Sequence, residues 1–200
     1  MLAEALASLH RCRPELIAIG ASAGAIEALG ALLPPLPAGL PVPLVIVVHL
    51  PPDRPNALAA YFATVTTLPV VEVNDKDVLT PGCVHIAPPD YHLLVERGLI
   101  AALSSDAPVL HSRPSIDVLF ESIADACGAR VLGILLSGAN ADGAQGLARM
   151  RARGAATWVQ RPETAAIATM PLAALELAPH LTFAPDVMGR GLAQWGHAHG

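Results

Sequence analysis

Short, almost continuously apolar runs alternate along the chain with longer segments in which apolar residues recur at helical spacing. The runs are rich in Val, Ile and Leu, as expected for parallel strands that are buried on both faces of a sheet. The predicted strands span residues 16–19, 44–48, 70–73, 131–136 and 156–159. The predicted helices span residues 23–33, 56–66, 116–127, 144–153, 163–169 and 172–178. This succession predicts the α/β fold class, with a doubly wound, mostly parallel sheet and helices on both faces.

Residues 84–103, with the sequence VHIAPPDYHLLVERGLIAAL, do not follow this alternation. Two short apolar runs meet at Arg97-Gly98, which is a plausible tight turn. We therefore expect an antiparallel β-hairpin appended to the sheet. A chain of 200 residues most simply forms one domain. We assign this domain to residues 15–195, with a short N-terminal extension at 1–14 and a tail at 196–200.

The amino-acid composition limits which partners this chain is expected to bind and the compartment in which we expect it. Hydrophobic residues make up 53% of the chain and charged residues 14%, with a net charge of -5 and scattered cations. This balance excludes a disordered chain and shows no nucleic-acid footprint. The apolar runs are far shorter than the roughly 20 residues that span a bilayer, and the first residues do not have the pattern of a secretory signal. We therefore expect a cytoplasmic protein with reduced cysteines and no direct membrane insertion.

Three residues of complementary chemistry lie in the segments that follow predicted strands. Ser22 lies in the turn GASAG after the first strand, His49 follows the second, and Asp142 lies in the loop after the 131–136 strand. In a doubly wound sheet the ligand site lies beyond the carboxyl ends of the strands. Serine, histidine and aspartate are the residue types of a nucleophile, a general base and an orienting acid. Their order along the chain differs from that of α/β-hydrolases, which indicates another fold with the same chemistry.

Each of these residues also has a purely structural interpretation. Ser22 and Asp142 both precede predicted helices and are suitable N-caps, and His49 could simply close a strand. The turn around Ser22 could instead bind a phosphate, but the dinucleotide fingerprint G-x-G-x-x-G is absent, and we expect no cofactor. The shared sheet edge favours the catalytic interpretation. In that interpretation the backbone N–H groups after Ser22, beginning with that of Ala23, would stabilise an oxyanion.

Six ordered blocks cover nearly the whole chain: IGASAGAIEAL, VVHLPPD, PGCVHIAPPDYHLLV, SRPSIDVLFESIA, GILLSGANADGAQGL and QRPETAAIATMPLAAL. Together they resemble the catalytic domain of the chemotaxis protein-glutamate methylesterase family (CheB type). The resemblance implies hydrolysis of γ-glutamyl methyl esters on chemoreceptors with release of methanol, and in some members deamidation of receptor glutamines. It places the family's nucleophile, base and acid on Ser22, His49 and Asp142. It also implies a methylated chemoreceptor or receptor-like protein as partner. We separately expect a regulator or kinase as a further partner.

Several positions depart from the family's pattern. Ala25 stands where the family often has a second glycine, and Ala139 where many members have a methionine whose backbone N–H is associated with oxyanion binding. A backbone donor survives a change of side chain, so Ala139 stays a candidate donor. Only 15 residues precede the first predicted strand. We therefore expect a catalytic domain without the family's N-terminal receiver domain.

The block SRPSIDVLFESIA leaves two interpretations open. Ser115 and Asp117 have the positions of a helix N-cap and a first-turn acid, whereas Arg113 could contribute to a substrate loop. The histidines at 85, 92 and 111 lack the spacing of metal ligands, and we predict no metal site. Two other functions stay compatible with the sequence. One is a catalytically weak module that binds receptors or signalling kinases, and the other is a small-molecule esterase.

Overall fold

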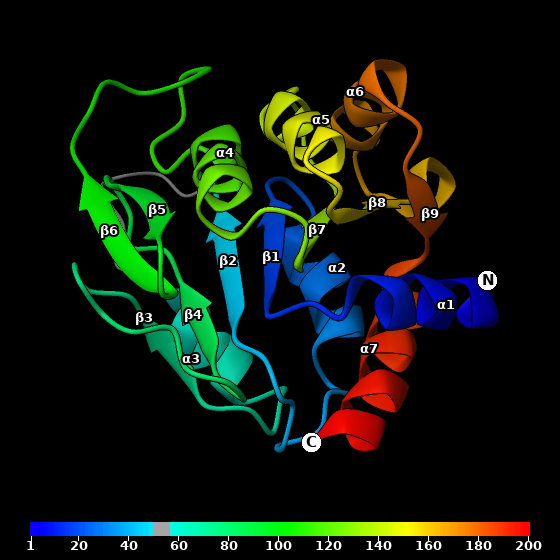
Figure 1. Ribbon diagram of the computed structural model, residues 1–200. Coiled ribbons are helices and arrows are strands. Elements are labelled where there is room, and N and C mark those ends of the chain that lie inside the picture. The colour runs from blue at the N-terminus through cyan, green and yellow to red at the C-terminus, as the bar shows by residue number, and fades with distance from the viewer. Residues whose placement is uncertain (50–56) are drawn as a thin grey trace.

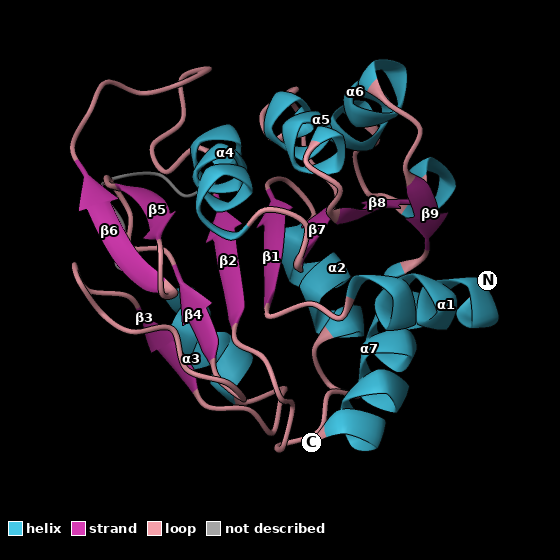
Figure 2. Cartoon of the chain, viewed as in Figure 1, coloured by secondary structure: helices cyan, strands magenta, loops and turns pink. Residues whose placement is uncertain are grey.

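A computed structural model of the chain shows a parallel sheet with helices packed on both faces (Figures 1 and 2). It describes residues 1–49 and 57–200. Within that part of the chain, the strands of the sheet are β1 (Leu16–Ala21), β2 (Leu44–Val48), β3 (Val70–Glu72), β4 (Val84–Ile86), β7 (Val131–Leu135), β8 (Ala156–Gln160) and β9 (Leu181–Phe183). The helices are α1 (Leu2–Cys12), α2 (Ala25–Leu32), α3 (Ala57–Ala63), α4 (Ile116–Cys127), α5 (Ala144–Ala152), α6 (Thr169–Leu177) and α7 (Pro185–His199).

The strand order of the sheet is β3-β4-β2-β1-β7-β8-β9, and every pair is parallel. The chain builds one half of the sheet on one side of β1 and then crosses to β7 on the other side. The strand order therefore reverses at β1, which is where doubly wound sheets bind their ligands. The pairs Ala21↔Val48 and Gly20↔Leu135 bring the carboxyl ends of β1, β2 and β7 to one edge.

The two faces of the sheet are covered by different helices. Alternate residues of β1, such as Ile17 and Ala18, belong to different hydrophobic clusters, as expected from the alternation of side chains along a strand. The cluster that contains Ile17 includes residues of α1, α2, α3 and α7. The cluster that contains Ala18 includes residues of α4, α5 and α6. The predicted doubly wound fold class is therefore confirmed.

The predicted hairpin is present as β5 (His92–Glu96) and β6 (Ile100–Ser104), which pair antiparallel across the Arg97-Gly98 turn. It forms a two-stranded sheet of its own and packs against α4 (Figure 1). The first apolar run of the segment, Val84–Ile86, does not belong to the hairpin. It is strand β4 of the main sheet, between β2 and β3.

The two ends of the chain form helices that the sequence analysis did not predict. Helices α1 and α7 contact each other beside the sheet (Figure 1), and Ala5, Leu9 and Trp195 are buried there. The residues at both ends thus contribute to the core, whereas the domain limits assigned above remain a prediction. Within residues 1–49 and 57–200, none of the helices combines the length and apolar character that crossing a bilayer requires.

The structure corrects two of the predicted helices. The helix predicted at 163–169 is wrong, because only the short 3-10 turn at Pro162–Thr164 forms there and α6 begins at Thr169. The helix predicted from residue 23 begins at Ala25, because Gly24 at its N-cap is in the left-handed conformation, with φ 87°. The helix predicted at 56–66 is observed as α3, and its predicted first residue lies outside the described residues.

Candidate active site

The edge of the sheet brings the three predicted residues to neighbouring strand ends. Ser22 directly follows β1, and its backbone N–H donates to the carbonyl of Ser137 at the end of β7, at 2.9 Å. His49 directly follows β2, and its backbone N–H donates to the carbonyl of Ala21, at 3.2 Å. Asp142 lies between β7 and α5. Backbone hydrogen bonds thus extend the sheet by one residue on β1 and on β2.

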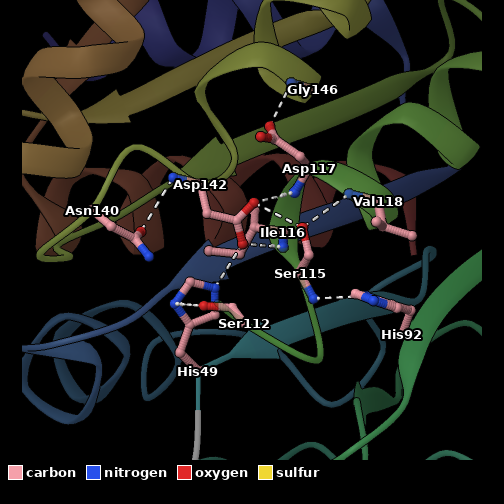
Figure 3. Close-up of polar contacts among 10 residues, drawn as sticks. All are labelled: His49, His92, Ser112, Ser115, Ile116, Asp117, Val118, Asn140, Asp142 and Gly146. Atoms are coloured by element: carbon pink, nitrogen blue, oxygen red, sulfur yellow. Dashed lines mark hydrogen bonds and ion pairs between the residues drawn. The ribbon is translucent and has the colours of Figure 1, made fainter. Parts of the chain in front are cut away.

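The structure joins two of these side chains directly. Nε2 of His49 lies 2.7 Å from Oδ2 of Asp142 (Figure 3). The Asp142 side chain is fully buried, and that of His49 is 11% exposed. A carboxylate accepts only, so Nε2 carries the hydrogen of this bond. The other ring nitrogen, Nδ1, is then the one that can accept a proton when the ring is neutral.

The Asp142 carboxylate also receives the first donors of helix α4. Its oxygens accept the backbone N–H of Ile116 at 2.7 Å, the backbone N–H of Asp117 at 3.0 Å and the hydroxyl of Ser115 at 2.8 Å (Figure 3). The structural interpretation of Asp142 as a helix cap is therefore partly right. The helix that it caps is α4, whereas the helix that follows it, α5, has Gly143 at its N-cap without a side-chain bond.

These contacts set the charge of Asp142. Burial by itself raises the pKa of this carboxyl, but the bonds from His49, Ile116, Asp117 and Ser115 outweigh it and hold the pKa below its usual range. Asp142 therefore stays ionised at neutral pH. Its stabilising contribution is fully present above the pKa of an unfolded aspartate and is lost as the pH falls through the lower pKa of the folded state.

The turn after β1 does not use Ser22 as a helix cap. Helix α2 begins only at Ala25, and no side chain bonds to its N-cap. The Ser22 carbonyl accepts the N–H of Ala25 at 2.9 Å. Among the described residues, no group forms a hydrogen bond with the Ser22 hydroxyl or with the N–H groups of Ala23 and Gly24. Within the described part of the chain, the turn therefore offers a hydroxyl without a partner beside backbone donors without acceptors.

Ala139 lies in the loop between β7 and α5, is exposed, and has a backbone N–H without an acceptor among the residues that the structure describes. The N–H groups of Ala23 and Ala139 are thus both available as oxyanion donors, as the sequence analysis expects. This role remains a prediction for both residues.

Arg113 does not have a free guanidinium group. It contacts Asp90 Oδ1 at 2.5 and 3.0 Å and donates to the carbonyls of Ser105 and Asp106 at 2.9 and 3.1 Å. Arg113 thus braces the segment between β6 and α4. Its membership of a substrate loop stays a prediction, and the contacts favour a role in holding that loop.

Comparison with known proteins agrees with this geometry. A family model described as CheB methylesterase matches residues 17–192, a range that contains all three strand-end residues. The chain belongs to the CheB methylesterase family.

Relatives and a solved structure agree with the CheB family. A putative protein-glutamate methylesterase/protein-glutamine glutaminase of Leptospira interrogans is 40% identical over 162 residues, which cover 81% of this chain and 84% of the relative. An enzyme of the same name from Treponema pallidum is 41% identical over 166 residues, or 82% of this chain and 41% of the relative. The crystal structure of the Thermotoga maritima CheB methylesterase catalytic domain superposes with a TM-score of 0.84 at 27% identity, covering 90% of this chain and 97% of that one.

The sequence analysis missed one contact of His49 in this CheB domain. The Ser112 hydroxyl lies 3.4 Å from His49 Nδ1 (Figure 3). Two backbone bonds between Val109 and Ser112, at 2.8 and 3.1 Å, close a tight turn that holds this hydroxyl in place. Nothing in the local sequence pattern indicates this, because the two residues are 63 positions apart.

The start of helix α4 confirms the structural interpretation of Ser115, which is its N-cap and accepts the N–H of Val118 at 3.4 Å. The Ser115 N–H donates to Nδ1 of the buried His92, at 3.1 Å. The other ring nitrogen of His92 lies 3.1 Å from the carbonyl of Ala107 and donates to it. His92 therefore links the start of α4 to the segment after the hairpin.

Asp117 is a buried carboxylate beside the site, and we expect its charge to cost stability. Burial raises its pKa to about 6, with the nearby charges of Asp142 and Glu121 adding to the shift and the backbone N–H groups of Gly146 and Gly143 opposing it. A carboxyl with a raised pKa binds its proton more tightly in the folded state, so stability falls as the pH rises from about 4 to about 6. We expect Asp117→Asn, which keeps an oxygen for Gly146, to raise the free energy of unfolding at pH 7 by about 1–2 kcal/mol.

Urea unfolding between pH 4 and pH 8 measures this effect. The matched control is Asp125→Asn, a substitution of an exposed carboxylate on the same helix that pairs with Arg149. We expect Asp117→Asn to flatten the decline of stability between pH 4 and pH 6 and Asp125→Asn to leave it unchanged. An equally steep decline in the Asp117 variant would contradict the prediction.

Proposed function

We propose that this chain is a serine-type hydrolase that demethylates glutamate methyl esters on chemoreceptor-like proteins and releases methanol. The observation that carries the proposal is the 2.7 Å bond between His49 and a buried, ionised Asp142, at the same strand edge as Ser22, whose hydroxyl bonds to none of the described residues. The names of the relatives, protein-glutamate methylesterase and protein-glutamine glutaminase, support the substrate class.

The proposed mechanism begins with attack of Ser22 Oγ on the ester carbonyl carbon while His49 Nδ1 takes the hydroxyl proton. Asp142 stabilises the imidazolium that forms. The negative charge on the carbonyl oxygen is stabilised by backbone N–H groups, for which Ala23 and Ala139 are the candidates. Collapse of the intermediate expels the methoxy group, which takes the proton from His49 and leaves as methanol.

A water molecule then attacks the acyl-enzyme, His49 again takes and returns the proton, and the glutamate carboxylate and free Ser22 result. The same steps on a glutamine side chain would release ammonia in place of methanol. No metal or organic cofactor is needed for either reaction. We further propose a cytoplasmic location, where the cytoplasmic part of a receptor is accessible, and a regulator or kinase as a second partner.

Methanol release from receptor-containing membranes that carry radiolabelled methyl esters tests the proposal. We expect the purified chain to release labelled methanol in proportion to its concentration, and Ser22→Ala to release none above background. Receptor binding by the wild-type protein without methanol release would instead support the weak binding module. Hydrolysis of small activated esters with no action on the receptor would support a small-molecule esterase.

A further inference from the structure

Ser137 lies directly behind the turn that carries Ser22. It lies just after the buried strand β7 and is itself fully buried. Its backbone carbonyl accepts the N–H of Ser22 at 2.9 Å, and its backbone N–H donates to the side-chain oxygen of Gln160 at 2.9 Å. The amide group of Gln160 in turn donates to the carbonyl of Thr164 at 2.9 Å. Ser137 therefore connects the end of β1 to the segment that precedes α6.

The hydroxyl of Ser137 has one hydrogen and two nearby carbonyls. Ala23 O lies 2.7 Å away and Ile167 O lies 3.1 Å away. The carbonyl of Ile167 already accepts the N–H of Gly138 at 3.1 Å. The shorter distance, and the absence of a competing donor to Ala23 O among the described residues, assign the hydrogen to Ala23 O. The same hydroxyl oxygen accepts the N–H of Ile167 at 2.9 Å, so it is a donor to one segment and an acceptor from another.

This assignment fixes the orientation of one of the two peptide groups after Ser22, the one between Ala23 and Gly24. In a planar trans peptide the N–H points opposite to the C=O. The Ala23 carbonyl points at the Ser137 hydroxyl, so the N–H of Gly24 points away from it. The Ser22 carbonyl points at the N–H of Ala25, so the N–H of Ala23 points away from that bond. The Ser137 hydroxyl thus holds the peptide group between Ala23 and Gly24. The N–H of Gly24 is one of the two N–H groups of this turn that have no acceptor among the described residues.

The packing at Gly24 shows how closely this hydroxyl approaches the turn. A Cβ at Gly24 would lie 2.6 Å from Ser137 Oγ and 2.8 Å from Ala166 Cβ, and the φ of Gly24 is 87°. Any residue with a side chain at position 24 would therefore force the turn or Ser137 to move. The second glycine of the GASAG turn is therefore required by its contact with Ser137 as well as by its own backbone conformation.

We propose that Ser137 is a positioning residue: it directly holds the peptide group between Ala23 and Gly24, and through it the turn whose backbone N–H groups are available to the oxyanion. The inference rests on the proposed serine mechanism for its catalytic consequence. Its structural part, the orientation of the turn by the Ser137 hydroxyl, stands on the hydrogen bonds alone. Gln160 supports Ser137 from behind, through the bond to its backbone N–H.

Ser137→Ala is expected to lower kcat by about 10- to 100-fold, because misplacing an oxyanion donor costs at most what its removal costs, on the order of 100- to 1000-fold. KM should change by less than about twofold, because Ser137 is buried and does not touch the substrate. The matched control is Thr157→Val, which removes another buried hydroxyl, bonded to His180 at 2.8 Å on β8. Thermal unfolding is measured in parallel, and rates are compared at a temperature where both variants are folded.

Amide hydrogen exchange gives a readout that does not depend on activity. The N–H groups of Ser22 and Ala25 bond to backbone carbonyls that Ser137→Ala leaves in place. We expect their exchange to accelerate by at least about tenfold in Ser137→Ala and to stay unchanged in Thr157→Val. Unchanged exchange at both amides in Ser137→Ala would overturn the proposal, and so would a kcat equal to that of Thr157→Val. If the wild-type protein lacked esterase activity, the proposed function would fall, and the exchange data alone would decide the role of Ser137.

Discussion

Ser22→Ala is expected to lower methylesterase turnover by several orders of magnitude while the free energy of unfolding changes by less than about 1 kcal/mol. The large loss of turnover follows from the loss of the only atom that the mechanism joins covalently to the substrate. The small change in stability follows from the structure, because Ser22 caps no helix and its hydroxyl bonds to none of the described residues. Methanol release and urea unfolding on the same samples measure both quantities.

The informative comparison is Ser112→Ala, which removes a hydroxyl beside His49, the proposed general base. Ser112 lies 3.4 Å from His49 Nδ1 and is the hydroxyl that the structure places on this nitrogen. If Ser22 is the nucleophile, Ser112→Ala should retain far more turnover than Ser22→Ala. A covalent probe for serine hydrolases, such as a fluorophosphonate, should label Ser22 in both the wild-type protein and the Ser112 variant. Labelling of Ser112, or near-normal turnover in Ser22→Ala, would contradict the assignment of the nucleophile.

Asp142→Asn is expected to lower both the turnover and the free energy of unfolding. We expect a loss of turnover on the order of a thousandfold or more, because the amide cannot hold His49 in the required tautomer as the carboxylate does. Both carboxylate oxygens accept two donors each. One faces His49 and Ile116, and the other faces Ser115 and Asp117. Whichever way the new amide is turned, its NH₂ group meets a backbone N–H.

The expected loss of stability for Asp142→Asn is about 1–3 kcal/mol, the usual cost of a buried donor left without an acceptor. Steady-state kinetics and urea unfolding separate the two effects. Ser115→Ala serves as the control, because it removes one donor to Asp142 and the N-cap of α4 but leaves the bond between His49 and Asp142. We expect it to lose about 1 kcal/mol of stability and much less turnover than Asp142→Asn. Equal losses of turnover in the two variants would show that Asp142 acts only as a cap of α4.

The sequence by itself determined the fold class and the candidate residues at the carboxyl edge of the sheet. Continuous apolar runs indicate buried parallel strands, and the same periodicity locates the helices between them. Once a doubly wound sheet is expected, the residues after β1, β2 and β7 must lie near one another. Ser22, His49 and Asp142 could therefore be selected without any knowledge of distances.

The tertiary structure decided which groups these residues contact. Asp142 was a reasonable cap for the helix that follows it, yet it receives donors from α4, 25 to 27 positions away. Residues 165–168 follow a helical pattern, yet the bond from Ile167 to Ser137 takes the backbone out of the helix. The run 84–86 suits a hairpin, yet it completes the parallel sheet beside β2. Local spacing encodes periodicity and propensity, whereas a hydrogen bond between distant segments exists only after the sheet has brought them together. For that reason the sequence could select candidate residues for the site, and only the fold showed the network of contacts around them.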